Sequence, residues 1–294
     1  MRSKLVLTIF RSRKGLHLAN LLAVDNQIIK PATMSDTAVF VALGDDGGYS
    51  QALLRAYQGI GGAKGIVMRE VGVEPLDLTK IALRCSQIES IEDSLFDIHD
   101  LEDDQLLKMT NKLEDLNLEA IESIKENCEA EAVNGAALFI ASKTIEFTNL
   151  WNQEIEFKPY FIYYAIAGLT CLERNGNMII KIYDIHTQFT KTLIYLLSCN
   201  FTTTEIIQPF SMNAFTSERF LVCHRMLHKD LKEGGVIDQL KKIYTSLKTM
   251  HIQKSNDLDT LLVESTLKKA GFSLQGNPSS KYTSLTSNYD LLPP

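Results

Sequence analysis

The sequence predicts an α/β fold with a mostly parallel sheet, helices on both faces and an antiparallel hairpin at one edge. Three observations lead to this expectation. Short apolar runs of strand length alternate with segments of helical spacing over residues 15–224. A glycine-rich turn, GDDGG at 44–48, joins the first apolar run to a helix. The last two β segments follow one another without a helix between them, which favours antiparallel pairing.

Each element follows from its local pattern. Residues 159–173 are largely apolar and are expected to form a helix with Pro159 in its first turn, where proline is well tolerated. The segment Asn175-Gly176-Asn177 is expected to turn the chain into the next strand. In chain order, we expect helices at 15–24, 50–57, 100–130, 159–173, 188–198, 236–250 and 257–270, and strands at 37–43, 65–68, 136–141, 178–183, 203–208 and 219–223.

The chain divides into one main domain and two smaller regions. Residues 1–230 form the main domain, and 88–131 are an acidic helical insertion within it. That insertion holds fifteen Asp and Glu against three Lys, a local sum of −12, which leaves +6 on the rest of a chain whose net charge is −6. Residues 231–272 are expected to form a helical extension, and the polar tail 273–294 to be disordered.

Composition excludes several classes of protein. Hydrophobic residues make up 45% of the chain and charged residues 22%, which are ordinary globular values. No run approaches the roughly 18 consecutive apolar residues of a membrane span, and the N-terminus lacks the features of a secretory signal. The five cysteines are odd in number and show no C-x-x-C spacing. They fit a reducing compartment inside the cell, cytoplasmic or nuclear, and they exclude a cysteine-based zinc cluster.

The glycine turn is the most informative segment. Ligands of open α/β sheets bind at the carboxyl ends of the strands, and glycines let a backbone approach a ligand closely. The two aspartates of the turn argue against a pyrophosphate, because like charges would face each other. They suit a ligand with an amino-acid ammonium group, such as S-adenosylmethionine. A tight strand-to-helix connection without a ligand is the alternative.

Several motifs, in this order, resemble those of the FtsJ-type RNA ribose 2'-O-methyltransferases. The opening RSRKGLHL at 11–18 and GGYSQ at 47–51 resemble the start of that family. NGNMIIKIYD at 175–184 resembles its catalytic lysine strand, and QPFS at 208–211 with TSERFLVC at 216–223 resembles its final glutamate motif. The last form is closest to the mRNA-cap ribose methyltransferases. The resemblance implies a Rossmann-like class I methyltransferase fold.

The resemblance also implies a catalytic tetrad of Lys, Asp, Lys and Glu. Lys181 matches the second lysine, the base for the ribose 2'-hydroxyl, and Glu218 matches the glutamate. His17 stands at the position of the first lysine and Ser142 at that of the aspartate. Because two members are replaced, three functions stay open. One is S-adenosylmethionine-dependent methylation of RNA, and another is a catalytically inactive module that binds RNA or a protein. The third is a class I methyltransferase that acts on another nucleophile.

Cofactor contacts and partners follow from the same resemblance. S-adenosylmethionine is the implied cofactor, RNA, including capped mRNA, is the implied partner, and neither a metal nor a membrane is expected. Asp97 is the implied contact for the adenine. The acidic insertion or the C-terminal helices would suit a protein partner. The implied contacts for the methionine part of the cofactor are Gly44, Asp45, Asp46, Gly47, Gly48 and Tyr49.

Overall fold

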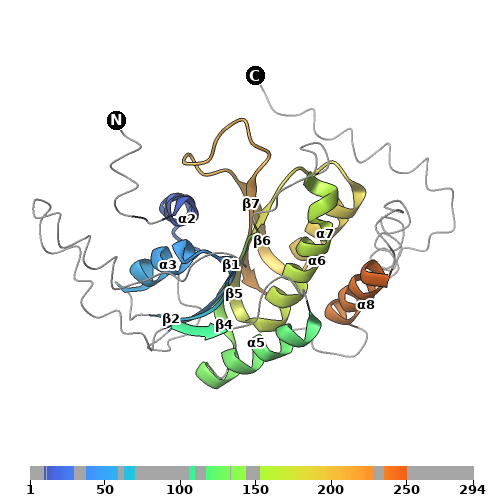
Figure 1. Ribbon diagram of the computed structural model, residues 1–294, viewed down its shortest axis with the longest axis horizontal. Helices are drawn as coiled ribbons and strands as arrows, with labels where there is room; N and C mark the ends of the chain where they lie inside the picture. The colour runs from blue at the N-terminus through green and yellow to red at the C-terminus, as the bar shows by residue number, and fades with distance from the viewer. Residues whose placement is uncertain are drawn as a thin grey trace, which may run out of the picture.

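The structure of the chain is a computed structural model in which one sheet lies between two layers of helices (Figure 1). None of the helices in the described part of the chain has both the length and the apolar composition that crossing a bilayer requires. The expected helix at 257–270, the tail from 273 and Asp97 lie outside the described residues. Those residues are 10, 12–29, 38–58, 63–69, 106–109, 117–132, 134–143, 153–227 and 235–249.

The sheet has seven strands in the order β3-β2-β1-β4-β5-β7-β6. All strand pairs from β3 to β5 are parallel, whereas β7 runs antiparallel to both β5 and β6. The predicted α/β class and the antiparallel hairpin at the edge are therefore confirmed. The strands are β1 Ala38–Asp45, β2 Ala63–Arg69, β3 Leu106–Met109, β4 Ala136–Ala141, β5 Leu172–Ile182, β6 Phe201–Ile207 and β7 Arg219–Met226. The helices are α2 Arg13–Val24, α3 Gly48–Gln58, α5 Leu118–Glu131, α6 Gln153–Cys171, α7 Gln188–Ser198 and α8 Val236–Thr249.

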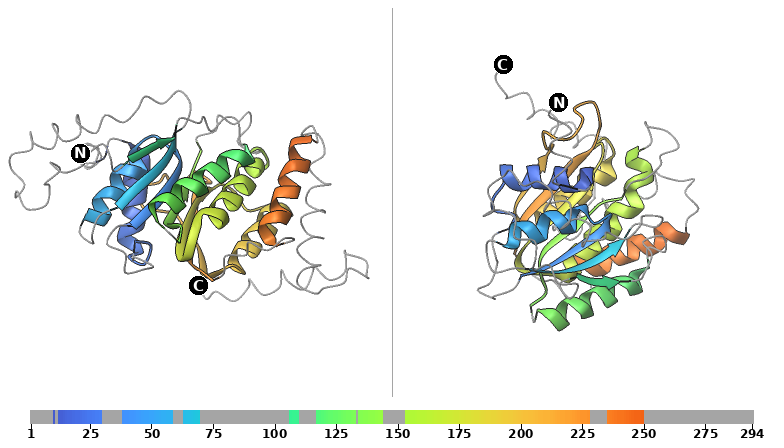
Figure 2. Two further views of the ribbon diagram at one scale, coloured as in Figure 1. Left: turned by 90° about the horizontal axis from the view of Figure 1, so that it is seen from below. Right: turned by 60° about the vertical axis from the view of Figure 1, so that its left-hand side comes forward.

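The two faces of the sheet form separate hydrophobic cores, because successive side chains of a strand point to opposite faces. One core joins the sheet to α2 and α3 and includes Leu18, Leu53 and Ile179. The other joins it to α5, α6, α7 and α8 and includes Ile180 and Ile182. Figure 2 shows the two helical layers on either side of the strands. This alternation turns Lys181 toward the α2 and α3 face.

Two predicted helices differ from those observed. Helix α6 begins at Gln153, so Pro159 lies inside it and the expected start at 159 is wrong. Glu154 and Glu156 lie in its first turn, where negative charge stabilises a helix. This stabilisation favours a helix start before Pro159, although proline usually lies in the first turn. Helices were expected over 100–130. Residues 118–131 are helical, but Leu106–Met109 forms a strand paired with β2, because sheet pairing overrides weak local preference.

The Asn175-Gly176-Asn177 segment lies within β5 and does not precede it. The register with β4 shifts between Ala136 and Leu138, and Asn175 has a φ of 67°. The extra residues therefore form a bulge, where left-handed backbone is common for asparagine. The bulge turns the Asn177 side chain toward the segment that follows α2.

The end of helix α2 is tied to the sheet by polar contacts. Asn177 Nδ2 donates to the carbonyls of Ile28 at 2.8 Å and Gln27 at 3.2 Å, and its Oδ1 accepts from the amide of Arg225 at 2.8 Å. His224 Nε2 lies 2.9 Å from Asp25 Oδ2, with both side chains largely buried. These contacts fix the orientation of α2, whose other end lies over the carboxyl edge of the sheet.

Replacing Asn177 by alanine is expected to lower the free energy of unfolding by about 1–3 kcal/mol, because buried backbone groups would lose their partners. Chemical denaturation measures this change. The exposed Asn26→Ala is the matched control and should leave the stability unchanged. Equal stability of both variants would show that the tie contributes nothing.

Candidate active site

The carboxyl ends of three parallel strands meet at one edge of the sheet. The first strand, β1, ends at Asp45, β4 is followed by Ser142, and β5 ends at Ile182. The Ser142 amide donates to the Leu43 carbonyl at 3.0 Å, so the ends of β1 and β4 are adjacent. Because β2 and β4 flank β1 on opposite sides, this is the topological switch point where ligands bind in open α/β sheets.

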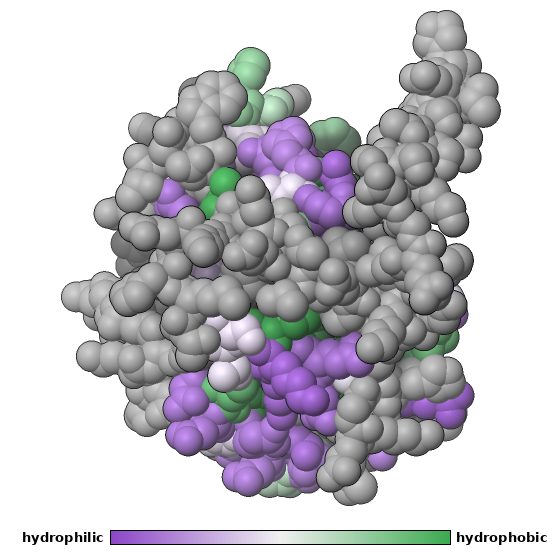
Figure 3. Space-filling model, turned by 90° about the vertical axis from the view of Figure 1, so that its right-hand side faces the viewer, coloured by the Kyte–Doolittle hydropathy of each residue, from purple (hydrophilic) through white to green (hydrophobic). Residues whose placement is uncertain are grey.

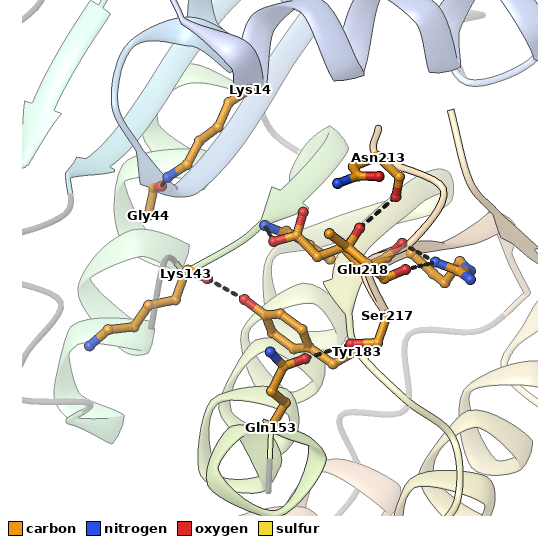
Figure 4. Close-up of polar contacts among 11 residues, drawn as sticks. Lys14, Gly44, Lys143, Gln153, Tyr183, Asn213, Ser217 and Glu218 are labelled. Atoms are coloured by element: carbon orange, nitrogen blue, oxygen red, sulfur yellow. Dashed lines mark hydrogen bonds and ion pairs between the residues drawn. The ribbon is translucent and has the colours of Figure 1, made fainter. Parts of the chain in front are cut away.

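Lys181 and Glu218 form an ion pair at this edge. Lys181 Nζ lies 2.6 Å from Glu218 Oε1, and the exposed fractions of the two side chains are 10% and 30%. The register of β5 and β7 pairs Ile182 with Arg219, which puts Glu218 just beyond the end of the ladder. Nζ also lies 5.6 Å from the centre of the Tyr183 ring. Figure 4 shows Glu218 and Tyr183 in this part of the site.

His17 reaches the same place from helix α2. Its Nδ1 lies 2.8 Å from Ser211 Oγ, which belongs to the loop between β6 and β7. Burial lowers the pKa of His17, and the charges of Lys181 and Arg13 lower it further, while Glu218 opposes them. The imidazole is therefore biased toward its neutral form. Three of the four predicted catalytic residues, His17, Lys181 and Glu218, are thus gathered in one place.

Ser142 is fully buried at the end of β4. Its Oγ has no hydrogen bond of good geometry among the described residues, although the phenol of Tyr49 lies close enough to interact with it. Burial also raises the pKa of Tyr49, and the Glu218 charge acts in the same direction. The Tyr49 ring therefore links the glycine turn to the surroundings of Ser142 and Glu218.

The two aspartates of the glycine turn hold helix α3. Asp45 is fully buried and accepts from the amides of Tyr49 and Ser50 at 2.9 Å and from Ser50 Oγ at 2.5 Å. Burial raises the pKa of Asp45, and these hydrogen bonds oppose that shift. Asp46 Oδ1 accepts from the amide of Gly48 at 2.9 Å and from Ser12 Oγ at 3.0 Å. Asp45 caps the helix from the interior, whereas Asp46 is partly exposed at the surface of the turn.

Helix α2 packs closely against this turn. A Cβ on Gly48 would overlap Ser12 Oγ and would lie 2.7 Å from the backbone nitrogen of Gly15, so only glycine fits there. Lys14 Nζ donates to the Gly44 carbonyl at 2.7 Å, as Figure 4 shows. Gly44 and Gly47 have φ values of 68° and 95°, which glycine adopts readily. The sequence did not single out Ser12 and Ser211 as site residues, although they belong to the RSRKG and QPFS motifs.

No group of three His, Cys, Asp or Glu side chains that could hold a metal ion is present in the described part of the chain. The polar groups of the edge are instead one ion pair, one imidazole, one buried hydroxyl and the carboxylates of the glycine turn. Such a set can hold an organic cofactor and move a proton.

The sheet order with helices on both faces is the fold of the class I methyltransferases. A crystal structure described as a ribosomal RNA methyltransferase of Plasmodium falciparum shares the fold, with a TM-score of 0.50 at 14% identity over 74% of this chain and 99% of that one. The sequence model of the FtsJ-like methyltransferase family matches residues 10–226. The chain belongs to the FtsJ-like methyltransferase family, which confirms the resemblance seen in its motifs.

Two relatives share part of the sequence. Both are named cap-specific mRNA (nucleoside-2'-O-)-methyltransferase 1. The Drosophila melanogaster protein is 30% identical over 106 residues, which is 36% of this chain and 13% of that protein. The Xenopus laevis protein is 31% identical over 112 residues, 38% of this chain and 12% of that protein. The matched segments therefore span about an eighth of the length of these relatives.

The pKa of His17 is expected to report on its two charged neighbours. Lys181→Met should raise it, because a positive charge that opposes protonation is removed. Glu218→Gln should lower it, because the favourable negative charge is lost. Titration of the His17 ring by NMR measures both shifts, with the exposed Lys191→Met as control. Unchanged values in both variants would contradict the arrangement described above.

Proposed function

We propose that this chain binds S-adenosylmethionine and transfers its methyl group to a ribose 2'-oxygen of RNA, with capped mRNA as the substrate. The observation that carries the proposal is the Lys181–Glu218 pair at the carboxyl edge of the sheet, on a strand separated only by β4 from β1, whose end carries the glycine turn. The names of the relatives, which specify the nucleoside 2'-oxygen of capped mRNA, support the choice of substrate.

The glycine turn offers a fit for the amino-acid end of the cofactor. Asp46 uses one carboxylate oxygen for Gly48 and Ser12, and its other oxygen has no hydrogen bond among the described residues. That oxygen is suited to accept from an ammonium group. The backbone of Gly44 and Gly47 would lie beside the same group. Asp45 would act indirectly, by holding the turn in shape, and Asp97 remains an expectation for the adenine.

The proposed chemistry assigns one proton transfer to this chain. S-adenosylmethionine, when bound, supplies an electrophilic methyl group on a positively charged sulfur. Lys181, once it has given up its resting proton, would accept the proton of the ribose 2'-hydroxyl as that oxygen bonds to the methyl carbon and the carbon–sulfur bond breaks, which would leave the sulfur as a neutral thioether. Glu218 would hold Lys181 in position and balance its charge afterwards. His17, anchored by Ser211, would orient the ribose, because a neutral imidazole both donates and accepts hydrogen bonds.

One observation favours a second function, that of a module that binds RNA or protein without catalysis. A carboxylate at position 142 would face the reacting groups in the family's tetrad, and here the buried Ser142 hydroxyl stands there instead. A hydroxyl cannot stabilise the protonated base as a carboxylate does. The same fold and the same cofactor would then serve only for binding.

Purified chain, labelled S-adenosylmethionine and capped RNA test the enzyme directly. We expect label in the ribose, and we expect Lys181→Met to lower the rate by about a hundredfold or more because the base is lost. Lys191→Met, an exposed lysine of α7, is the control and should keep the wild-type rate. Cofactor binding without transfer to any RNA would favour the inactive module.

Restoring a carboxylate at position 142 distinguishes a chain whose methyl transfer is slowed by the replaced residues from a chain that has no methyl transfer. Ser142→Asp combined with His17→Lys restores all four members of the family's tetrad with balanced charges, and it is expected to raise the transfer rate. Ser142→Ala keeps the site without a carboxylate and should leave the rate close to that of the wild type. Single-turnover methyl transfer measures all three proteins. A rate that is unchanged in the double variant would mean that these two positions play no part in the chemistry.

A further inference from the structure

The loop between β6 and β7, residues 208–218, presents two bare aromatic rings. Phe215 is 98% exposed and Phe210 is 93% exposed, and they are the two most exposed large hydrophobic side chains in the described part of the chain. Leaving two such rings in water forgoes the stabilisation that their burial would give. Single exposed apolar side chains are common, but two on one loop beside a functional site require a reason.

Hydrogen bonds within the loop hold these rings outward. The amide of Phe215 donates to Asn213 Oδ1 at 3.1 Å, and Thr216 Oγ1 donates to the Asn213 carbonyl at 2.8 Å. On the other side of the loop, the amide of Met212 donates to the Pro209 carbonyl at 2.9 Å. Met212 itself is buried, with 6% of its surface exposed. The loop thus has a fixed inner side and projects Phe210 and Phe215 from its outer side.

The inner side of the same loop forms part of the candidate active site. Ser211, next to Phe210, contacts His17, and Glu218, three residues after Phe215, pairs with Lys181. In Figure 1 the loop rises from the sheet beside α2. Figure 3 shows hydrophobic side chains at the upper end of the molecule, at the height of this loop in Figure 1. The two rings therefore project from the same loop whose inner side borders the candidate active site.

Two arginine side chains lie close to the site and to the base of this loop. Arg13 is exposed, precedes His17 by one helical turn on α2, and acts on the His17 ring through its charge. Arg219 Nη1 donates to the carbonyls of Thr216 and Glu218 at 2.7 Å, which places a second guanidinium at the base of the loop. Aromatic rings next to cations are the combination that single-stranded nucleic acids bind, because bases stack on the rings and phosphates meet the cations.

We propose that Phe210 and Phe215 form a stacking platform for unpaired bases of the RNA strand beside the ribose in the site. This inference rests on the proposed function and extends it to the form of the RNA, which must be single-stranded at this point. A protein partner is less well matched, because Ser211, Asn213 and Thr216 separate the two rings with polar groups. Stacking needs only the faces of the rings and suits bases of any sequence.

Short RNAs that carry 2-aminopurine, either unpaired or in a duplex, test the platform by fluorescence quenching and by affinity. The full chain should bind the unpaired RNA more tightly and quench its fluorescence. Phe210→Ser with Phe215→Ser should weaken that binding by roughly tenfold or more for each ring. Phe210→Trp with Phe215→Trp should retain it. Tyr195→Ser, which removes an exposed aromatic of α7, is the matched control and should bind like the wild type.

Parallel measurements separate this inference from the proposed function. Loss of RNA affinity in the serine variants, with unchanged affinity for S-adenosylmethionine, supports the platform whether or not the chain transfers a methyl group. Methyl transfer with an unchanged KM for RNA in the serine variants would overturn the platform and leave the enzyme intact. Wild-type chain that binds no RNA, or that prefers the duplex, would also overturn it.

Discussion

The ion pair of Lys181 and Glu218 is the interaction on which the site depends. An ammonium on an inner strand is costly to remove from water, and a carboxylate at 2.6 Å offsets that cost. The pair requires the antiparallel register of β5 and β7, because that register brings Glu218 level with the end of β5. The loop before β7 also contacts His17 through Ser211. The site therefore joins β5, β7 and α2.

In the proposed tetrad, the two replacements leave the net charge of the four residues unchanged. A lysine, an aspartate, a second lysine and a glutamate would together carry no net charge. Here His17 is biased toward its neutral form and Ser142 is uncharged, so one positive and one negative charge are absent together. The remaining pair of Lys181 and Glu218 is balanced as well. Loss of only one of the two charges would have left a partly buried ion without a partner, which is strongly destabilising.

Most of the fold was predictable from the sequence, because it follows from local periodicity. Helix α7 was predicted at its observed bounds, and the apolar run of β4 was unambiguous. The failures have physical causes that local patterns do not contain. Residues 106–109 form a strand through pairing with β2, and Asn175 lies in a bulge whose existence depends on the register with β4. The resemblance implied that Lys181 and Glu218 belong to one site, and their atoms Nζ and Oε1 lie 2.6 Å apart. The use of Asp45 as a buried helix cap was not predicted, because two adjacent aspartates precede α3 and the path of the turn decides which of them faces the amides of Tyr49 and Ser50.

We propose that the glycine turn and Lys181 face one ligand from two sides. A crystal structure of the chain with S-adenosylhomocysteine tests it most directly. We expect the amino-acid end of this ligand to contact Asp46 and the backbone of Gly44 and Gly47, with the sulfur directed toward Lys181 Nζ. A structure in which the ligand binds elsewhere, or in which the side of the turn that faces Lys181 stays filled by protein side chains, would contradict it.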